Sequence, residues 1–330
     1  MSVVLSAAAL LTLTGCVTVH GEREIVPAVR KAEAAKALKA YTAATNKANE
    51  ALDPALDKDV ETGALAAIDQ AGLKARGKVS PEGNPKYTPL ELTDVRYTIP
   101  KLAGWPRFFL ADADSNRDDN RWLLVFTRAG VDQKWKAAYL SVVTEEEMPE
   151  FATDKDGYAE PVPDGDASGL AVAPDQLSRT YADFLDVSTD AGQGAGDAKA
   201  QDAPFAPGPA TTQLRQQRKS QLRTPTYWTQ YDDQPGRAPQ YPPIALRTAD
   251  GGALAFFATH HTQKRTVAQG SRIGRIGDPY IRALMKGEAR RTLTLIKMSE
   301  SAVRIPAKDS GSERIEFLHR LEGLTEARGG

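Results

Sequence analysis

The spacing of apolar residues changes along the chain, and this change limits the fold classes open to it. Between residues 27 and 52 the apolar side chains recur at intervals of four and three, which places them on one face of a helix. The members of this stripe are Ala34, Leu38, Tyr41, Thr45, Ala48 and Leu52. Pro27 suits the first turn of that helix, and a weaker helical pattern at 60–75 predicts a second one.

Beyond residue 90 the apolar residues alternate instead, which is the pattern of half-buried strands. Val95, Tyr97 and Ile99 show this alternation most plainly. Further strands, separated by polar turns, are expected at 107–110, 121–127 and 135–143. The first half of the chain therefore predicts two helices followed by an antiparallel sheet.

The second half repeats this order. Helices are expected at 176–187 and 212–223, and strands at 244–248, 253–262, 292–305 and 314–321. The sequence thus predicts an α+β fold of two tandem units, each with helices followed by a curved antiparallel sheet. This order of elements resembles that of NTF2-like and cystatin-like units. The resemblance implies a sheet that wraps helices and leaves a pocket at its open end.

Composition sets the expected boundaries of these units. The first α+β domain is expected at 25–143 and the second at 176–330, with an acidic connector at 144–175. The connector holds ten acidic residues against one lysine, Lys155, and four prolines interrupt it. Residues 188–210 are rich in Gly, Ala, Asp and Pro, which predicts a mobile insertion in the second domain.

The single cysteine of the chain follows an apolar run. Residues 3–13 are almost wholly apolar, too few to span a bilayer as a helix and typical of a signal peptide. The next residues complete the sequence Leu13-Thr14-Gly15-Cys16, which resembles the lipobox of bacterial lipoproteins. The resemblance implies cleavage before Cys16 and a diacylglycerol on its sulfur.

The lipobox resemblance also implies a location. We expect a signal peptide at 1–15 and a tether at 16–24, with acyl chains such as palmitate holding the mature protein on the extracytoplasmic face of the cell membrane. Such signals begin with Lys or Arg, whereas residues 1–4 carry no charged side chain, so we expect the true start to lie upstream. The alternative is an ordinary apolar helix with a buried cysteine.

A lipobox followed by two α+β units, in a chain biased toward Ala, Asp, Arg and Gly, resembles the secreted lipoproteins of high-GC actinobacteria. That resemblance implies a location and a fold class but no chemistry. The net charge of −1 gives no global attraction to nucleic acid, and one cysteine excludes a cysteine-rich zinc site. We find no sequence motif for a cofactor, so none is predicted.

One acidic segment has the alternation of a calcium loop. Its oxygen-bearing residues are Asp112, Asp114, Asn116 and Asp118. However, Arg117 stands where such a loop needs glycine, and Leu123 where it needs a bidentate glutamate. The segment therefore predicts the polar tip of a hairpin between Phe109 and Trp122, and the sequence predicts no metal site.

Four residues are the candidates for ligand binding. His260 and His261 are adjacent on an expected strand, so they point to opposite faces and at most one can face a pocket. Trp228 and Tyr231 lie in a segment rich in aromatic residues and proline, which suits a platform for sugar or peptide. The alternatives are a packed strand histidine and aromatic rings that pack on the sheet.

These observations favour a lipid-anchored binding, accessory or scaffold protein of the cell envelope, with no catalytic residue assigned. Residues 212–328 hold 20 basic and 11 acidic side chains, which suits an anionic envelope polymer or a protein partner. The alternative is an enzyme with an NTF2-like pocket, in which a histidine and a carboxylate perform acid-base chemistry.

Overall fold

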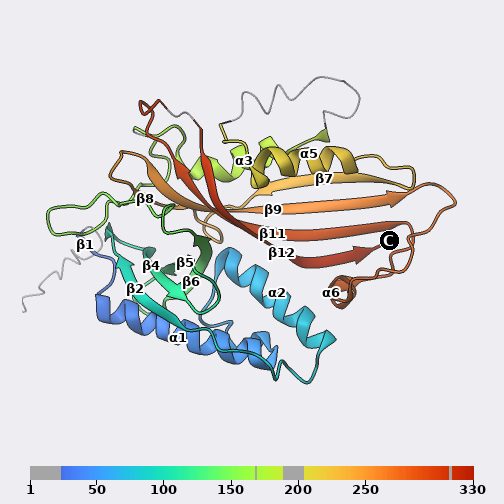
Figure 1. Ribbon diagram of the computed structural model, residues 1–330, viewed down its shortest axis with the longest axis horizontal. Coiled ribbons are helices and arrows are strands. Elements are labelled where there is room, and N and C mark those ends of the chain that lie inside the picture. Colours follow the sequence, from blue (N-terminus) through green and yellow to red (C-terminus); the bar gives the residue numbers. More distant parts are fainter. Residues whose placement is uncertain (1–23, 168, 189–203, 312–313) are drawn as a thin grey trace, which may run out of the picture.

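The computed structural model describes residues 24–167, 169–188, 204–311 and 314–330 (Figure 1). The elements of the first half are β1 (Ile25–Pro27), α1 (Lys31–Ala51), the 3-10 turn η2 (Pro54–Leu56), α2 (Gly63–Val79), β2 (Leu92–Thr98), β3 (Lys101–Ala103), β4 (Arg107–Ser115), β5 (Arg121–Arg128) and β6 (Lys136–Val143). The elements of the second half are the 3-10 turn η3 (Pro174–Gln176), α3 (Leu177–Leu185), the π-helical turn η5 (Pro209–Gln213), α5 (Leu214–Gln221), β7 (Tyr227–Pro235), β8 (Ile244–Arg247), β9 (Ala253–Val267), α6 (Pro279–Leu284), β10 (Met285–Lys286), β11 (Thr292–Ile305) and β12 (Glu316–Gly329).

The small sheet has the strand order β2-β4-β5-β6 and is antiparallel throughout. Helix α1 packs on its outer face, where the ring of Tyr41 meets that of Phe126 edge-on. Phe126 in turn stacks on Phe109, with ring centroids 4.9 Å apart. The stripe predicted for this helix is confirmed, because its members from Ala34 to Leu52 are buried.

The large sheet has the order β10-β12-β11-β9-β7, and β8 also pairs with β9. Only the short pairing of β10 with β12 is parallel among its described strands. Helices α3 and α5 lie on one face of this sheet (Figure 1). Tyr181 of α3 anchors that layer, because its ring packs against Phe257 and Phe317 of the sheet.

The two sheets share one core. Val125 of β5 and Phe256 of β9 belong to the same cluster of buried apolar side chains. Helix α2 lies between the sheets at the edge of this cluster and contacts both β6 and β12 (Figure 1). Gly323 of β12 permits that approach, because a Cβ atom there would lie 2.5 Å from Cγ2 of Ile68 on α2.

The predicted α+β class is confirmed, although helices are its minor part. The tandem NTF2-like or cystatin-like units are not confirmed, because the core described above joins the two halves, and that finer likeness stays a prediction. Residues 1–23, with the predicted signal peptide and most of the tether, lie outside the described residues, as do 189–203 of the predicted insertion. Within the described ranges, no helix combines the length and the apolar character needed to cross a bilayer.

The hairpin predicted in place of a calcium loop is confirmed as the β4–β5 pair, with a shorter tip at 116–120. Asp112 and Asp114 lie on β4 instead of in the tip. Both bind Arg121 of β5, with oxygen-to-nitrogen distances of 2.5 and 2.6 Å. These carboxylates therefore neutralise a guanidinium that is itself buried in the sheet.

Candidate functional site

Strand β9 carries His260 and His261 to opposite faces of the large sheet, as expected for adjacent strand residues. The ring of His260 meets Tyr241 edge-on, with centroids 5.0 Å apart. His261 is buried on the other face, beneath Arg218 of α5. The two histidines therefore have separate surroundings.

His261 is the centre of a buried polar network. Its Nδ1 lies 2.5 Å from Oδ1 of Asp233 on β7, and its Nε2 lies 2.8 Å from Oγ of Ser299 on β11. Nη2 of Arg320 on β12 also lies 3.1 Å from Nε2. Asp233, His261 and Ser299 thus follow the order of hydrogen bonds found in acid-base-nucleophile triads.

Two features disfavour a catalytic role for this chain of hydrogen bonds. Ser299 is 0 % exposed, so no substrate can reach its hydroxyl without movement of the sheet. A guanidinium can only donate, so Nε2 of His261 accepts from Arg320 and its lone pair is occupied. Burial lowers the pKa of His261, which leaves the ring neutral with its proton on Nδ1, facing Asp233. The network instead suits a structural role, because its members connect α5 with strands β7, β9, β11 and β12.

Trp228 and Tyr231, the two aromatic candidates, also lie on opposite faces of the large sheet. Tyr231 and His261 line one small cavity of about 90 Å³, where the Tyr231 hydroxyl donates to Gln221 at 3.0 Å. Trp228 lies on the opposite face of β7, exposed in a groove beside Pro225. The structure therefore brings together two of the four predicted residues, Tyr231 and His261. Ligand binding at these four positions stays a prediction.

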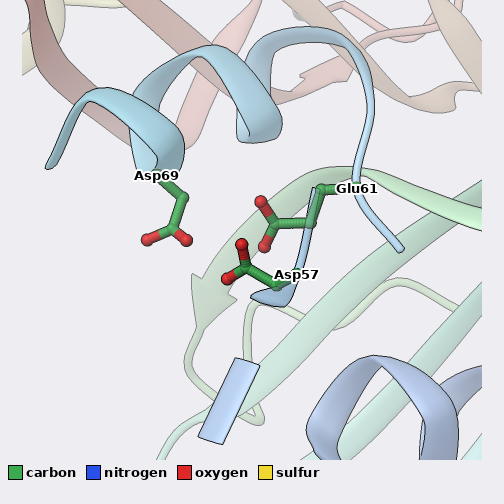
Figure 2. Close-up of side chains that lie close together, drawn as sticks. All are labelled: Asp57, Glu61 and Asp69. Carbon is green, nitrogen blue, oxygen red and sulfur yellow. The ribbon is translucent and has the colours of Figure 1, made fainter. Parts of the chain in front are cut away.

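A cluster of carboxylates that the sequence analysis missed lies between the sheets. Asp57, Glu61 and Asp69 place oxygen atoms within 4.8 Å of one another, and Figure 2 shows their side chains converging. Asp57 follows the turn η2, Glu61 forms a bridge with Ala137 of β6, and Asp69 lies on α2. Three consecutive local structures of one short stretch, residues 57–69, therefore build the cluster.

Local structure fixes two of these side chains. The N–H of Thr62 donates to the carbonyl of Ala137 at 2.9 Å, and the N–H of Ala137 donates to Val60 at 2.8 Å, so the segment with Glu61 is attached to β6. Asp69 lies four residues from Leu65 and from Leu73, both of which are buried on α2. Because helical residues four apart share a face, Asp69 points inward with them.

The cluster has few hydrogen-bond partners. Glu61 is 2 % exposed, and neither of its carboxylate oxygens has a hydrogen bond of good geometry with a described residue, although the Gln70 amide is close enough to oppose the rise in the pKa of Glu61. Gln70 donates to Oδ1 of Asp57 at 2.6 Å, whereas Oδ2 of Asp57 and Oδ2 of Asp69 lack a partner within that same set. Nη2 of Arg76 lies 3.8 Å from Oδ1 of Asp69. One ion pair of this length cannot neutralise three carboxylates.

Burial and mutual repulsion raise the pKa values of the cluster. Burial, followed by the charge of Asp69, raises the pKa of Glu61 to about 9 and that of Asp57 to about 7. Burial also raises the pKa of Asp69, although Arg76 opposes this effect. Full ionisation of the group is thus unfavourable unless a positive charge joins it. Such a group can hold protons at neutral pH, or it can exchange them for a cation.

A fourth carboxyl group approaches from the large sheet. Glu300 of β11 is fully buried; its Oε1 accepts the N–H of Leu140 on β6 at 3.1 Å, and its Oε2 has no partner among the described residues. Burial raises the pKa of Glu300 well above its usual range, and its charge contributes to the raised pKa of Glu61. Glu300 therefore connects the two sheets beside the cluster.

A cavity of about 320 Å³ gives access to this cluster. Glu61 and Asp69 line it together with Tyr41, Trp122 and Leu321. The sequence held one signal for the site, an aspartate at position 69 in the apolar stripe of a helix. Asp57 and Glu61 follow no metal-binding motif, and only the fold brings them to Asp69.

Comparison with known proteins places the chain in a family. Residues 25–329 match the model of a domain of unknown function, DUF8094. An uncharacterized lipoprotein of Streptomyces avermitilis is 48% identical over 319 residues, which cover 97% of this chain and 92% of that protein. Two uncharacterized lipoproteins of Streptomyces coelicolor are 45% and 29% identical, each over 97% of this chain and over 92% and 90% of their own lengths. No solved structure matches.

These relatives support the prediction of an actinobacterial-type lipoprotein and imply a membrane-anchored protein of the cell envelope. The matched region begins at Ile25, the first residue of β1, and ends at Gly329, the last residue of β12. It therefore covers both sheets, the carboxylate cluster and the histidine network. The chain belongs to the DUF8094 family.

Proposed function

We propose that this protein is anchored by acyl chains on Cys16 at the extracytoplasmic face of the cell membrane and binds a divalent cation, calcium in preference, at Asp57, Glu61 and Asp69. The observation that carries the proposal is the state of Glu61. Its two carboxylate oxygens are buried, unpartnered among the described residues and directed at two further carboxylates. A buried anion without a partner is costly, and a cation supplies the missing partner.

The donor set and its dimensions favour calcium. Hard cations such as Ca²⁺ and Mg²⁺ take oxygen ligands, and the three side chains offer only oxygen. Two oxygens on opposite sides of Ca²⁺ lie roughly 4.6 to 5.2 Å apart, and those around Mg²⁺ roughly 4.0 to 4.2 Å. The oxygens here lie within 4.8 Å of one another, so one cation can contact all three. Mg²⁺ demands near-ideal octahedral geometry and keeps several waters, whereas Ca²⁺ accepts an irregular set of protein oxygens, which favours Ca²⁺.

Protons are the competing occupants of the cluster. With a pKa near 9 for Glu61 and near 7 for Asp57, the metal-free group holds protons at pH 7. If protons were its sole partners, the cluster would be a structural feature with no ligand. A cation must displace them, so the two possibilities differ in what calcium does to the purified protein.

Calorimetric titration of the full-length protein with CaCl2 is the decisive experiment. We expect a Kd on the order of 10⁻⁴ to 10⁻³ M, the range of calcium sites outside cells. Binding at pH 7 should release about one to two protons, so the measured enthalpy should depend on the ionisation enthalpy of the buffer. MgCl2 should bind more weakly.

Two variants make the titration specific. Glu61→Gln keeps the shape of the side chain and should abolish calcium binding. Asp59→Asn is the matched control, because Asp59 is an exposed neighbour paired with Lys134 at 3.6 Å, and it should bind calcium as the wild type does. A folded wild-type protein that gives no heat with calcium and no rise in Tm would overturn the cation proposal.

The lipid anchor has an independent test. Cys16→Ala should abolish lipid labelling and release the protein from the membrane fraction, because acyl burial is the strong attachment that the lipobox resemblance implies. Calcium binding should survive this change, since the cluster lies in the folded part of the chain. A Cys16→Ala protein that remains on the membrane and still takes up the label would refute the anchor alone.

A further inference from the structure

Three large apolar side chains are exposed at the end of the molecule where the chain emerges from its N-terminal segment. Ile25 is 67 % exposed, Val131 is 65 % exposed and Trp105 is 36 % exposed. They come from β1, from the loop after β5 and from the loop before β4. Exposed apolar groups that gather from separate segments indicate a surface with a partner.

Pairing and hydrogen bonds place these residues on neighbouring segments. Ile25 pairs with Ala103 of β3, two residues before Trp105. The guanidinium of Arg128 lies over the Trp105 ring, 5.3 Å from its centroid, and also donates to the carbonyl of Val131. We call Ile25, Trp105 and Val131, together with Arg107 and Arg128, the anchor-end surface.

The chemistry of this surface matches the interface of a phospholipid bilayer. Tryptophan prefers that interface, because its ring is apolar and its N–H is polar. Arg107 also lies over the Trp105 ring, 4.7 Å from its centroid, and forms no ion pair with any described residue. A guanidinium beside an aromatic ring can reach phosphate groups while its stem stays in apolar surroundings.

The position of the anchor brings this surface to the membrane. Ile25 is nine residues after Cys16, and a fully extended chain of that length spans at most about 32 Å. The acylated cysteine therefore keeps Ile25 within that distance of the lipid. Figure 1 shows β1 at one end of the molecule and α6 at the opposite end, so α6 is held away from the lipid when β1 is near it.

We propose that the anchor-end surface docks on the phospholipid headgroups, with Trp105 and Val131 at the level of the interface and Arg107 on phosphate. The proposal rests on the acylation of Cys16 in the proposed function but not on the cation site. Docking fixes the orientation of the protein. It directs the far ends of the large sheet and α6 away from the membrane.

Site-specific fluorescence tests this orientation. Because Cys16 is the single cysteine and its sulfur is acylated, a cysteine introduced elsewhere can be labelled alone. Val131→Cys places an environment-sensitive dye on the surface, and Tyr280→Cys on α6 is the matched control, exposed at the opposite end. The full-length acylated protein is bound to vesicles of phosphatidylglycerol and phosphatidylcholine that carry a quencher at the headgroup level.

The expected result is quenching at position 131 that exceeds quenching at position 280 by roughly threefold or more, since docking brings the first dye into the interfacial layer. Adding Trp105→Gln to Val131→Cys should reduce that difference. Equal quenching at both positions in vesicle-bound protein would overturn the docking proposal. So would energy transfer between dyes at position 131 without lipid quenching, because a second copy would then cover the surface.

Failure of the anchor gives a different result. If Cys16 were not acylated, the parent protein without an added cysteine would itself take up the dye. It would also fail to float with the vesicles. Either outcome refutes the anchor of the proposed function, and equal quenching in floated, acylated protein refutes docking alone.

Discussion

Nδ1 of His261 and Oδ1 of Asp233 lie 2.5 Å apart on adjacent strands, in direct register across β9 and β7. Asp233 also accepts from Nη2 of Arg218 at 3.1 Å, so α5 is attached to the sheet through the same carboxylate. Hydrogen bonds from His261 and Arg218 lower the pKa of Asp233, although its burial acts in the opposite direction. The group is thus an ionised carboxylate in the interior.

Asp233→Ala should lower the free energy of unfolding by about 3 to 5 kcal/mol, because it leaves a buried guanidinium without its partner. His260→Ala, which removes an edge contact with Tyr241, should lower it by about 1 kcal/mol. Urea denaturation of the three proteins measures both differences.

His261→Ala should fold less stably and still support the biological function when expressed at the wild-type level. The expectation follows from the occupied Nε2 and the inaccessible Ser299. Melting temperature and in-cell complementation are measured for the same variant. A His261→Ala protein that melts like the wild type yet fails to complement would promote the enzymatic alternative.

The carboxylate cluster should make the metal-free protein less stable as pH rises. A carboxyl group whose pKa is higher in the folded state than in the unfolded state binds more protons when folded, so stability falls with pH between the two pKa values. For Glu61 this window runs from about 4.3 to about 9. Thermal melts in chelator across this range measure the effect.

Glu61→Gln isolates that contribution from the other titrating groups. In chelator at pH 8 the variant should melt several degrees above the wild type, since a neutral amide replaces a buried acid. Calcium should reverse the order by raising the Tm of the wild type alone. A wild type and a variant with parallel pH profiles would contradict the prediction.

Phe205→Ala should destabilise the protein by about 3 to 5 kcal/mol. Its ring is buried against Tyr181, Phe184 and Phe317, although it falls in the stretch that the sequence predicts to be mobile. Trp228→Ala removes a larger ring from an exposed position and should change stability by less than about 1 kcal/mol. Chemical denaturation of both variants checks the contrast.

Gly323→Ala should weaken calcium binding without touching a carboxylate. The added methyl group meets Ile68, the neighbour of Asp69 on α2, and either the helix or the strand must move. Gly277→Ala is the control, because no atom lies within 4 Å of the added methyl group. We expect a loss of affinity of roughly tenfold for the first variant alone, measured by calorimetry. Unchanged affinity in a folded Gly323→Ala protein would show that the position of α2 does not control the site.

Periodicity predicted the elements whose apolar side chains face a single core. The stripe of α1 and strand β11 were both predicted, the latter with its bounds at 292 and 305. Strand β7 was missed, because Asp232 and Asp233 are poor strand formers. The partners of Asp233 come from α5 and β9, and they are far away in sequence.

The carboxylate cluster could not be predicted for a different reason, because its three residues are near one another in sequence but follow no metal-binding motif. The sequence singled out His261 and Tyr231, which the fold does bring together. The carboxylate cluster depends on a turn, a bridge to β6 and a helix face, and no local pattern encodes their meeting. Asp69 is the one member of the cluster that the sequence could have indicated, because its place in the apolar stripe of a helix predicts that its side chain points inward.

Glu300 and the backbone of residues 60–62 cover the free edge of β6, and this affects how molecules of the protein associate. Strand β6 is at the edge of the small sheet. Unpaired N–H and C=O groups on an edge strand can form hydrogen bonds with strands of other chains. The backbone at 60–62 pairs with Ala137, and the carboxyl of Glu300 takes the N–H of Leu140. Acyl anchoring concentrates a protein in two dimensions, where an open edge would promote aggregation. If the protein is anchored by acyl chains as proposed, the covered edge allows it to be crowded on a membrane without strand-to-strand pairing through β6.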